Sequence, residues 1–157
     1  MQFTHSGTDT IVVKTKTEPI TIGATLTIGS FTIPGAGEYD VASIACEGQA
    51  MESGAFVYSI RTEDLMITYL TKLDREVTKL DGVSNTNVLV LDLRSDDTAD
   101  MIKPIVKAVE PQYLVLIGAG ATEPLIAELA IPILESTGLK ITRTGLPLEG
   151  TSILKRD

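Results

Sequence analysis

The segment from residue 87 to residue 118 restricts the fold more than any other part of the chain. Residues 88–91 and 113–117 are two apolar runs of strand length, in which apolar and polar positions do not alternate. Between them, from Asp97 to Val109, apolar residues recur at helical spacing. Strands that are apolar on both faces are typical of parallel sheets covered by helices. The segment therefore predicts a buried strand, a helix and a second strand parallel to the first.

The pattern before residue 34 predicts a different kind of sheet. Isoleucine, leucine and phenylalanine alternate with threonine, and turn residues interrupt the alternation. Such short segments are typical of an antiparallel meander, with strands at residues 11–14, 19–22, 25–28 and 31–33. One face of this sheet is apolar, and the other carries mostly threonine and lysine. Because threonine is common on exposed sheet faces, we expect the second face to be open to water or to a partner.

The middle of the chain predicts three more strands and a short helix. The strands lie at residues 41–46, 56–60 and 65–70, with a tight turn between the last two. Leucine and valine at helical spacing over residues 73–80 predict the helix. Glu38 and Tyr39 come just before the first of these strands, and we interpret them as a structural corner in which the tyrosine hydroxyl fixes a turn.

Beyond residue 120 the pattern predicts one more helix. Thr122 is a good N-cap for it, residues 125–133 form its apolar face and Gly138 ends it. Pro104 and Pro132 both fall inside helical patterns. A proline in a helix removes one backbone hydrogen bond, so each helix is expected to be kinked or broken there.

The elements together predict the α/β class, in the form of an α+β sandwich of two packed β-sheets with helices mainly on the C-terminal sheet. Residues 139–142 and 151–154 are expected to be edge strands. The 157 residues suit one domain, 1–157, and neither a linker nor an internal repeat divides them.

The composition excludes several classes of partner. Hydrophobic residues make up 43% and charged residues 22%, as in folded globular proteins. A net charge of −8 disfavours nucleic acid and anionic membrane surfaces. We find neither an apolar segment long enough to span a membrane nor the basic and apolar regions of a signal peptide. Cys46 is the one cysteine, so an internal disulfide is excluded and a cytoplasmic location is expected.

Three motifs in order along the chain carry a resemblance to a known family. The first runs from Pro34 to Val41 and is followed by Gly48, and the second is the pair of strands at 56–60 and 65–70. The third is the β-α-β unit. Over roughly residues 8 to 135, these motifs resemble the metallo-β-lactamase superfamily, in particular its small bacterial branch of predicted zinc-dependent hydrolases. The resemblance implies two β-sheets of metallo-β-lactamase type.

The resemblance also shows which metal ligands of that superfamily the chain lacks. The superfamily binds metal through an H-x-H-x-D-H motif after an early strand, a bridging aspartate and later histidines. Here the strand at 19–22 passes directly into Gly23, and residues 70–73 and 117–120 contain neither aspartate nor histidine. The helix that normally follows the histidine motif is missing as well. We therefore expect a reduced helix layer on the N-terminal sheet.

The supply of donor residues leads to the same expectation independently. A catalytic zinc needs three protein ligands, usually including histidine. The chain contains one histidine, His5, and one cysteine, Cys46, which lie far apart in the sequence. His5 is expected to lie in a frayed N-terminus. We expect no metal, no cofactor and no catalytic residues, and hence no enzyme, although the ancestral class would be a metal-dependent hydrolase.

Two other segments offer alternative sites. Asp92, Asp96, Asp97 and Asp100 follow a buried strand and open a helix, where carboxylates could hold an atypical metal, although helix capping is the favoured interpretation. The residues from Gly118 to Thr122 could bind an anion or a nucleotide. That segment lacks the full glycine spacing, because residue 123 is an acidic glutamate, so a tight turn is favoured.

The remaining nucleophiles suggest no catalytic site. The serines have no base nearby other than His5, and no G-x-S-x-G motif is present. Cys46 lies in an apolar strand without a basic neighbour and is interpreted as an inert core thiol.

We therefore rank three functions. The first is a non-catalytic metallo-β-lactamase-like domain that has lost its metal site and acts in binding or assembly, with a protein partner or a second copy of itself. The second is a metal-dependent hydrolase that uses the aspartates from Asp92 to Asp100. The third is an anion or nucleotide binder at Gly118 to Thr122.

Overall fold

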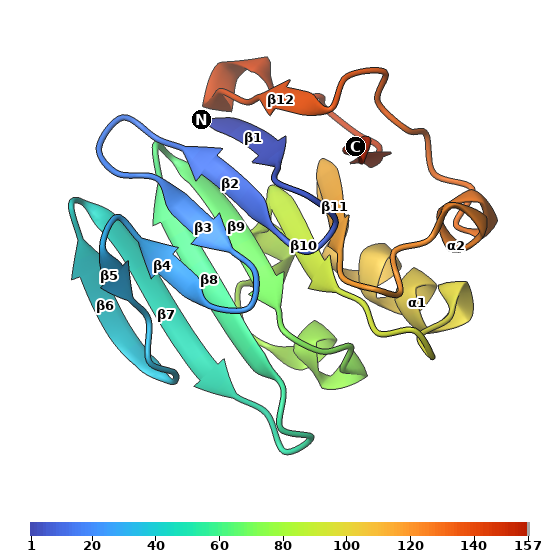
Figure 1. The fold of residues 1–157 in the computed structure, drawn as a ribbon, viewed down its shortest axis with the longest axis horizontal. Coiled ribbons are helices and arrows are strands. Elements are labelled where there is room, and N and C mark those ends of the chain that lie inside the picture. Colours follow the sequence, from blue (N-terminus) through green and yellow to red (C-terminus); the bar gives the residue numbers. More distant parts are fainter. Residues whose placement is uncertain (157) are drawn as a thin grey trace.

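The computed structural model describes residues 1–156, which form two β-sheets packed face to face (Figure 1). The first sheet has six antiparallel strands in the order β12-β1-β2-β3-β4-β5, and the second has seven strands in the order β13-β11-β10-β9-β8-β7-β6. The first sheet comprises β1 (Gln2–His5), β2 (Ile11–Lys14), β3 (Ile20–Ile22), β4 (Leu26–Ile28), β5 (Phe31–Thr32) and β12 (Gly138–Lys140). The second comprises β6 (Gly37–Val41), β7 (Ile44–Ala50), β8 (Phe56–Thr62), β9 (Leu65–Leu70), β10 (Val88–Asp92), β11 (Tyr113–Ile117) and β13 (Ser152–Ile153).

The helices lie on the outer side of the second sheet (Figure 1). They are α1 (Ala99–Val109), α2 (Glu123–Glu128) and the 3₁₀ helices η1 (Arg75–Lys79) and η2 (Val83–Asn85), with a further 3₁₀ turn, η3 (Arg143–Gly145), after β12. This confirms the predicted sandwich with its helices mainly on the C-terminal sheet. None of the helices in residues 1–156 is long and apolar enough to cross a membrane.

The β-α-β unit forms as predicted, because β10 and β11 pair in parallel. The side chains of a strand alternate between the two faces of a sheet, and the unbroken apolar runs serve two cores at once. Val88 and Val90 pack into the core between the sheets, whereas Leu89 and Leu91 pack into the core beneath the helices. Each of the four is fully buried.

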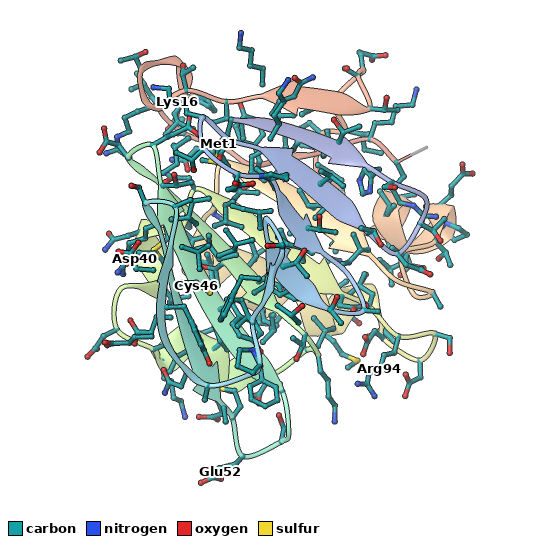
Figure 2. All side chains as sticks on the ribbon, turned by 60° about the vertical axis from the view of Figure 1, so that its left-hand side comes forward. Met1, Lys16, Asp40, Cys46, Glu52 and Arg94 are labelled. Carbon is teal, nitrogen blue, oxygen red and sulfur yellow. The ribbon has the colours of Figure 1, made fainter. Side chains whose placement is uncertain are left out.

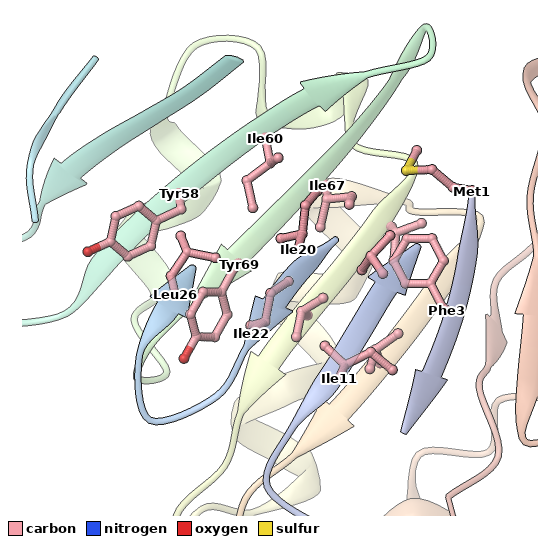
Figure 3. Packing of buried hydrophobic residues seen from close by; sticks show 14 of the residues in the cluster. Met1, Phe3, Ile11, Ile20, Ile22, Leu26, Tyr58, Ile60, Ile67 and Tyr69 are labelled. Carbon is pink, nitrogen blue, oxygen red and sulfur yellow. The ribbon is translucent and has the colours of Figure 1, made fainter. Parts of the chain in front are cut away.

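The core between the sheets is built largely from isoleucine (Figure 3). The apolar positions that alternate with threonine in the first sheet, such as Ile20 and Ile22, face Ile60, Ile67 and Tyr69 of the second sheet. The alternation therefore gave the buried face of the first sheet correctly.

The opposite face of the first sheet is covered by no helix (Figure 1). Strand pairing places one outward residue of five successive strands in a single row, which we call the threonine row: Thr4, Val12, Thr21, Thr27 and Thr32. A second outward row consists of Lys140, Gln2 and Lys14. The expected reduction of the helix layer on this sheet is confirmed.

Two predicted elements in the middle and at the end of the chain were wrong. The strand predicted at 41–46 is divided by a hairpin turn, since Ala42 and Ser43 have φ angles of 50° and 64° and β6 pairs with β7. The helix predicted to run to Gly138 ends after Glu128, and Pro132 lies beyond it. By contrast, α1 continues through Pro104.

Candidate functional site at the edge of the sandwich

The ends of several strands meet at one edge of the sandwich, which we call the site edge. The backbone N–H of Gly118, after β11, donates to the carbonyl of Thr8, in the loop after β1, at 3.0 Å. The hydroxyl of Tyr69, near the end of β9, donates to the carbonyl of Gly23, after β3, at 3.2 Å. Segments from both sheets are thus brought together where the resemblance would place metal ligands.

Tyr69 and Asp92 form the polar centre of the site edge. The Tyr69 hydroxyl lies between the Gly23 carbonyl and the Asp92 carboxylate, and its single proton can serve only one of them at a time. Burial raises the pKa of Tyr69 further above its usual value, and the charge of Asp92 adds to this. The hydroxyl therefore acts as a neutral hydrogen-bond donor.

Burial also raises the pKa of Asp92. The Arg94 guanidinium and the hydrogen bond with Tyr69 counteract this effect, whereas the charges of Asp9 and Asp97 add to it. Arg94 lies on the exposed loop after β10 (Figure 2). The arrangement offers one half-buried carboxylate and a phenol, which can bind a polar group but do not provide a nucleophile activated by a base.

Tyr69 is the member of this pair that the sequence did not reveal. It lies in the run of β9 that is buried at every position, and from sequence such a residue resembles ordinary core. Asp92 could be found because it ends a buried strand. No local signal links the two residues, since the pairing of β9 with β10 decides their proximity.

The four candidate aspartates do not form one site. Asp97 accepts a hydrogen bond from the backbone N–H of Arg94 at 2.7 Å, so it stabilises the loop before α1 rather than capping the helix. Asp100 lies in the first turn of α1 with Lys103 at 3.9 Å, and Asp96 is exposed. Within residues 1–156, no three His, Cys, Asp or Glu side chains come close enough to hold a metal ion.

The segment from Gly118 to Thr122 is a compact connection between β11 and α2. The backbone N–H groups of residues 118, 120, 121 and 122 all donate to carbonyl groups of the protein. Thr122 caps α2 as predicted, accepting a bond from Leu125 at 3.4 Å. A phosphate needs free N–H groups, and this segment has already committed four of them.

The donor set does not fit a catalytic zinc at the site edge. His5 is not in a frayed terminus as expected: it is the last residue of β1 and is 4% exposed. Cys46 is buried in β7, and burial raises its pKa to about 11, which agrees with an inert core thiol. The ends of β9 and β11 supply no histidine or aspartate.

The structural interpretation of Tyr39 is supported directly. Its hydroxyl donates toward the carbonyl oxygens of Gly35, at 3.0 Å, and Ala36, at 3.1 Å. The side chain therefore fixes the turn that leads into β6, as expected from the sequence.

The comparisons with known proteins concern the fold of the chain. No protein-family model matches the chain, and no curated protein matches its sequence. A solved structure from Thermotoga maritima, described as a predicted Zn-dependent hydrolase of the metallo-β-lactamase superfamily, superposes with a TM-score of 0.71. The two chains are 12% identical, and the match covers 97% of this chain and 96% of the other. The chain has the metallo-β-lactamase fold. At this identity the likeness concerns the fold alone.

Proposed function

We propose that this chain is a non-catalytic domain of the metallo-β-lactamase fold that acts in assembly by binding a second copy of itself. The observation that carries the proposal is the donor set of the site edge. Tyr69, Asp92, Asp9 and Arg94 gather there, and the remaining histidine, His5, is buried in β1. Carboxylates and a phenol without imidazole or thiolate are a poor set of ligands for zinc.

The uncovered face of the first sheet is the surface through which the domain would bind. The threonine row and the row of Lys140, Gln2 and Lys14 form the outer face of a sheet whose apolar side is already buried. Lys14 and Lys140 are the only charged side chains on the strands of this sheet. The face is thus basic in a chain with a net charge of −8.

The acidic counterpart lies at one edge of the second sheet, on strands β6 and β7. Glu38 of β6 and Glu47 of β7 are directly opposite each other, and Asp40 lies on the same edge strand. Like charges directly opposite each other destabilise a strand pair. Arg61 lines the same hollow as these three carboxylates and offsets part of their charge, so the group stays net negative. The lysine face of one copy and this acidic group of another would therefore be complementary.

Light scattering after gel filtration tests this assembly over a range of protein concentrations and salt. We expect a mass that rises with concentration and falls with added salt, because exposed charges are screened. Lys14→Glu should reduce the association. Lys107→Glu, an equal charge change on the helical side, should leave it unchanged. A strict monomer at high concentration would reject self-association, and stoichiometric zinc in untreated protein would reject the non-catalytic assignment.

A further inference from the structure

A hollow beside α2 has the properties of a small-molecule site. Its volume is about 440 Å³, and its walls come from α2, from residue 133 and from residues 153–156. Volumes of this size and mainly apolar linings are typical of ligand pockets. The hollow is separate from the site edge and from the uncovered sheet face.

The walls of the hollow are aliphatic. Ile126 and Ala127 come from α2, Ile133 from the loop after it, and Ile153 and Leu154 from the last strand and the residue beyond it. Ile133 is 49% exposed, an unusually open position for so large an apolar side chain. None of the described residues in the lining has an aromatic ring on which a nucleotide base could stack. A ligand with an aliphatic chain would therefore fit this wall well, because burying apolar surface against it is favourable.

The polar part of the lining selects a charge. Among the described residues, the lining includes the cations Lys155 and Arg156 and the carboxylate of Glu123. The Nε atom of Arg156 is buried and has no hydrogen-bond partner within residues 1–156. A buried N–H without an acceptor is unfavourable, and such groups are rare in folded proteins. Among the described residues of the lining, two cations stand against one carboxylate, which suits a ligand with a single negative charge.

We propose that this hollow binds an aliphatic carboxylate of the medium-chain fatty-acid class. The carboxylate would accept hydrogen bonds from the Arg156 guanidinium, with Lys155 adding its charge, and the hydrocarbon chain would lie against Ile133 and Ala127, the exposed apolar members of the described lining. A carboxylate suits the planar guanidinium group because it can accept two parallel bonds from it.

Calorimetric titration of the full chain with decanoate, below its micelle concentration, tests the proposal. We expect saturable binding at one site per chain. Arg156→Met should weaken binding by about tenfold or more, since a hydrogen bond to a charged group is lost. Arg143→Met, which removes an exposed arginine outside the hollow, should bind decanoate as the unmodified protein does. Ile133→Asn should also weaken binding, because it replaces part of the apolar wall with a polar side chain.

Ligand variants test the same point without changing the protein. Decanol and decylamine have the same alkyl chain length as decanoate, but decanol is neutral and decylamine is a cation. Both should bind at least about tenfold more weakly than decanoate. The proposal is overturned if decanoate gives no saturable heat, or if it binds no better than decanol. Equal affinity of the Arg156→Met and Arg143→Met proteins would overturn it too. None of these outcomes depends on the oligomeric state, so the test is independent of the proposed assembly.

Discussion

Gly120→Ala should destabilise this protein strongly, although Gly120 does not occupy a left-handed backbone conformation. A Cβ atom at this position would overlap the carbonyl oxygen of Arg94 and lie 2.6 Å from its carbonyl carbon. The obstacle is backbone of the loop before α1, which cannot rotate away as a side chain could. Gly120 also donates its N–H to the Leu93 carbonyl at 2.9 Å, so separating the two loops would stretch that bond.

The expected cost is about 2–3 kcal/mol, the upper part of the range for overpacking. For a chain of this length, that corresponds to a fall in the melting temperature of about 4–12 °C. Urea unfolding followed by circular dichroism measures the free energy directly. Gly138→Ala is the matched control, because its Cβ would meet nothing closer than 3.9 Å and its backbone is also outside the left-handed region. If Gly120→Ala unfolds within about 0.5 kcal/mol of the unmodified protein, the close approach of the two loops is not real.

Three further predictions concern single side chains: Tyr39, Asp92 and Cys46. Tyr39→Phe removes the hydroxyl that bonds to Gly35 and Ala36 and should lower the free energy of unfolding by about 1 kcal/mol in urea titrations; an unchanged value would show that the corner is held by packing alone. Burial raises the folded-state pKa of Asp92 above the ordinary value of 3.8, so its ionised form opposes folding above the folded-state pKa and the effect is absent below 3.8. Asp92→Asn should accordingly be more stable relative to the unmodified protein at pH 7 than at pH 3, and thermal melts that show the reverse order would contradict the raised pKa. Because the pKa of Cys46 is raised to about 11, its thiol should react with Ellman's reagent far more slowly in the folded protein at pH 8 than in guanidinium chloride, and fast reaction in the folded protein would place the thiol at the surface.

The candidate sites depended on contacts that sequence spacing does not contain. The residues from Gly118 to Thr122 resembled an anion-binding turn, but their N–H groups are used by loops that are distant in the sequence, including those of Thr8 and Leu93. The hollow beside α2 is another example. Lys155 and Arg156 are adjacent in the sequence, yet only the packing of the last strand brings them beside Ile133 and α2.

Errors in the predicted elements have local physical causes. Ala42 and Ser43 are not typical residues for a hairpin turn in which both central φ angles are positive, so the turn inside residues 41–46 left no signal. The helix after Thr122 ended early because Ala130 adopts a φ of 55°, two residues before Pro132. Pro132 therefore lies outside the helix, where its missing N–H breaks no helical hydrogen bond.

The sequence by itself determined the periodicities, and with them the two sheets, the β-α-β unit and the buried faces. It also determined the shortage of histidine and cysteine, because a count of residues needs no structure. Tertiary structure alone decided which distant groups become neighbours. It places Tyr69 near Asp92, the backbone of Gly120 against that of Arg94, and Arg156 beside an aliphatic wall. Periodicity records which side of an element is buried, whereas the identity of the neighbour across the interface depends on strand order and loop packing.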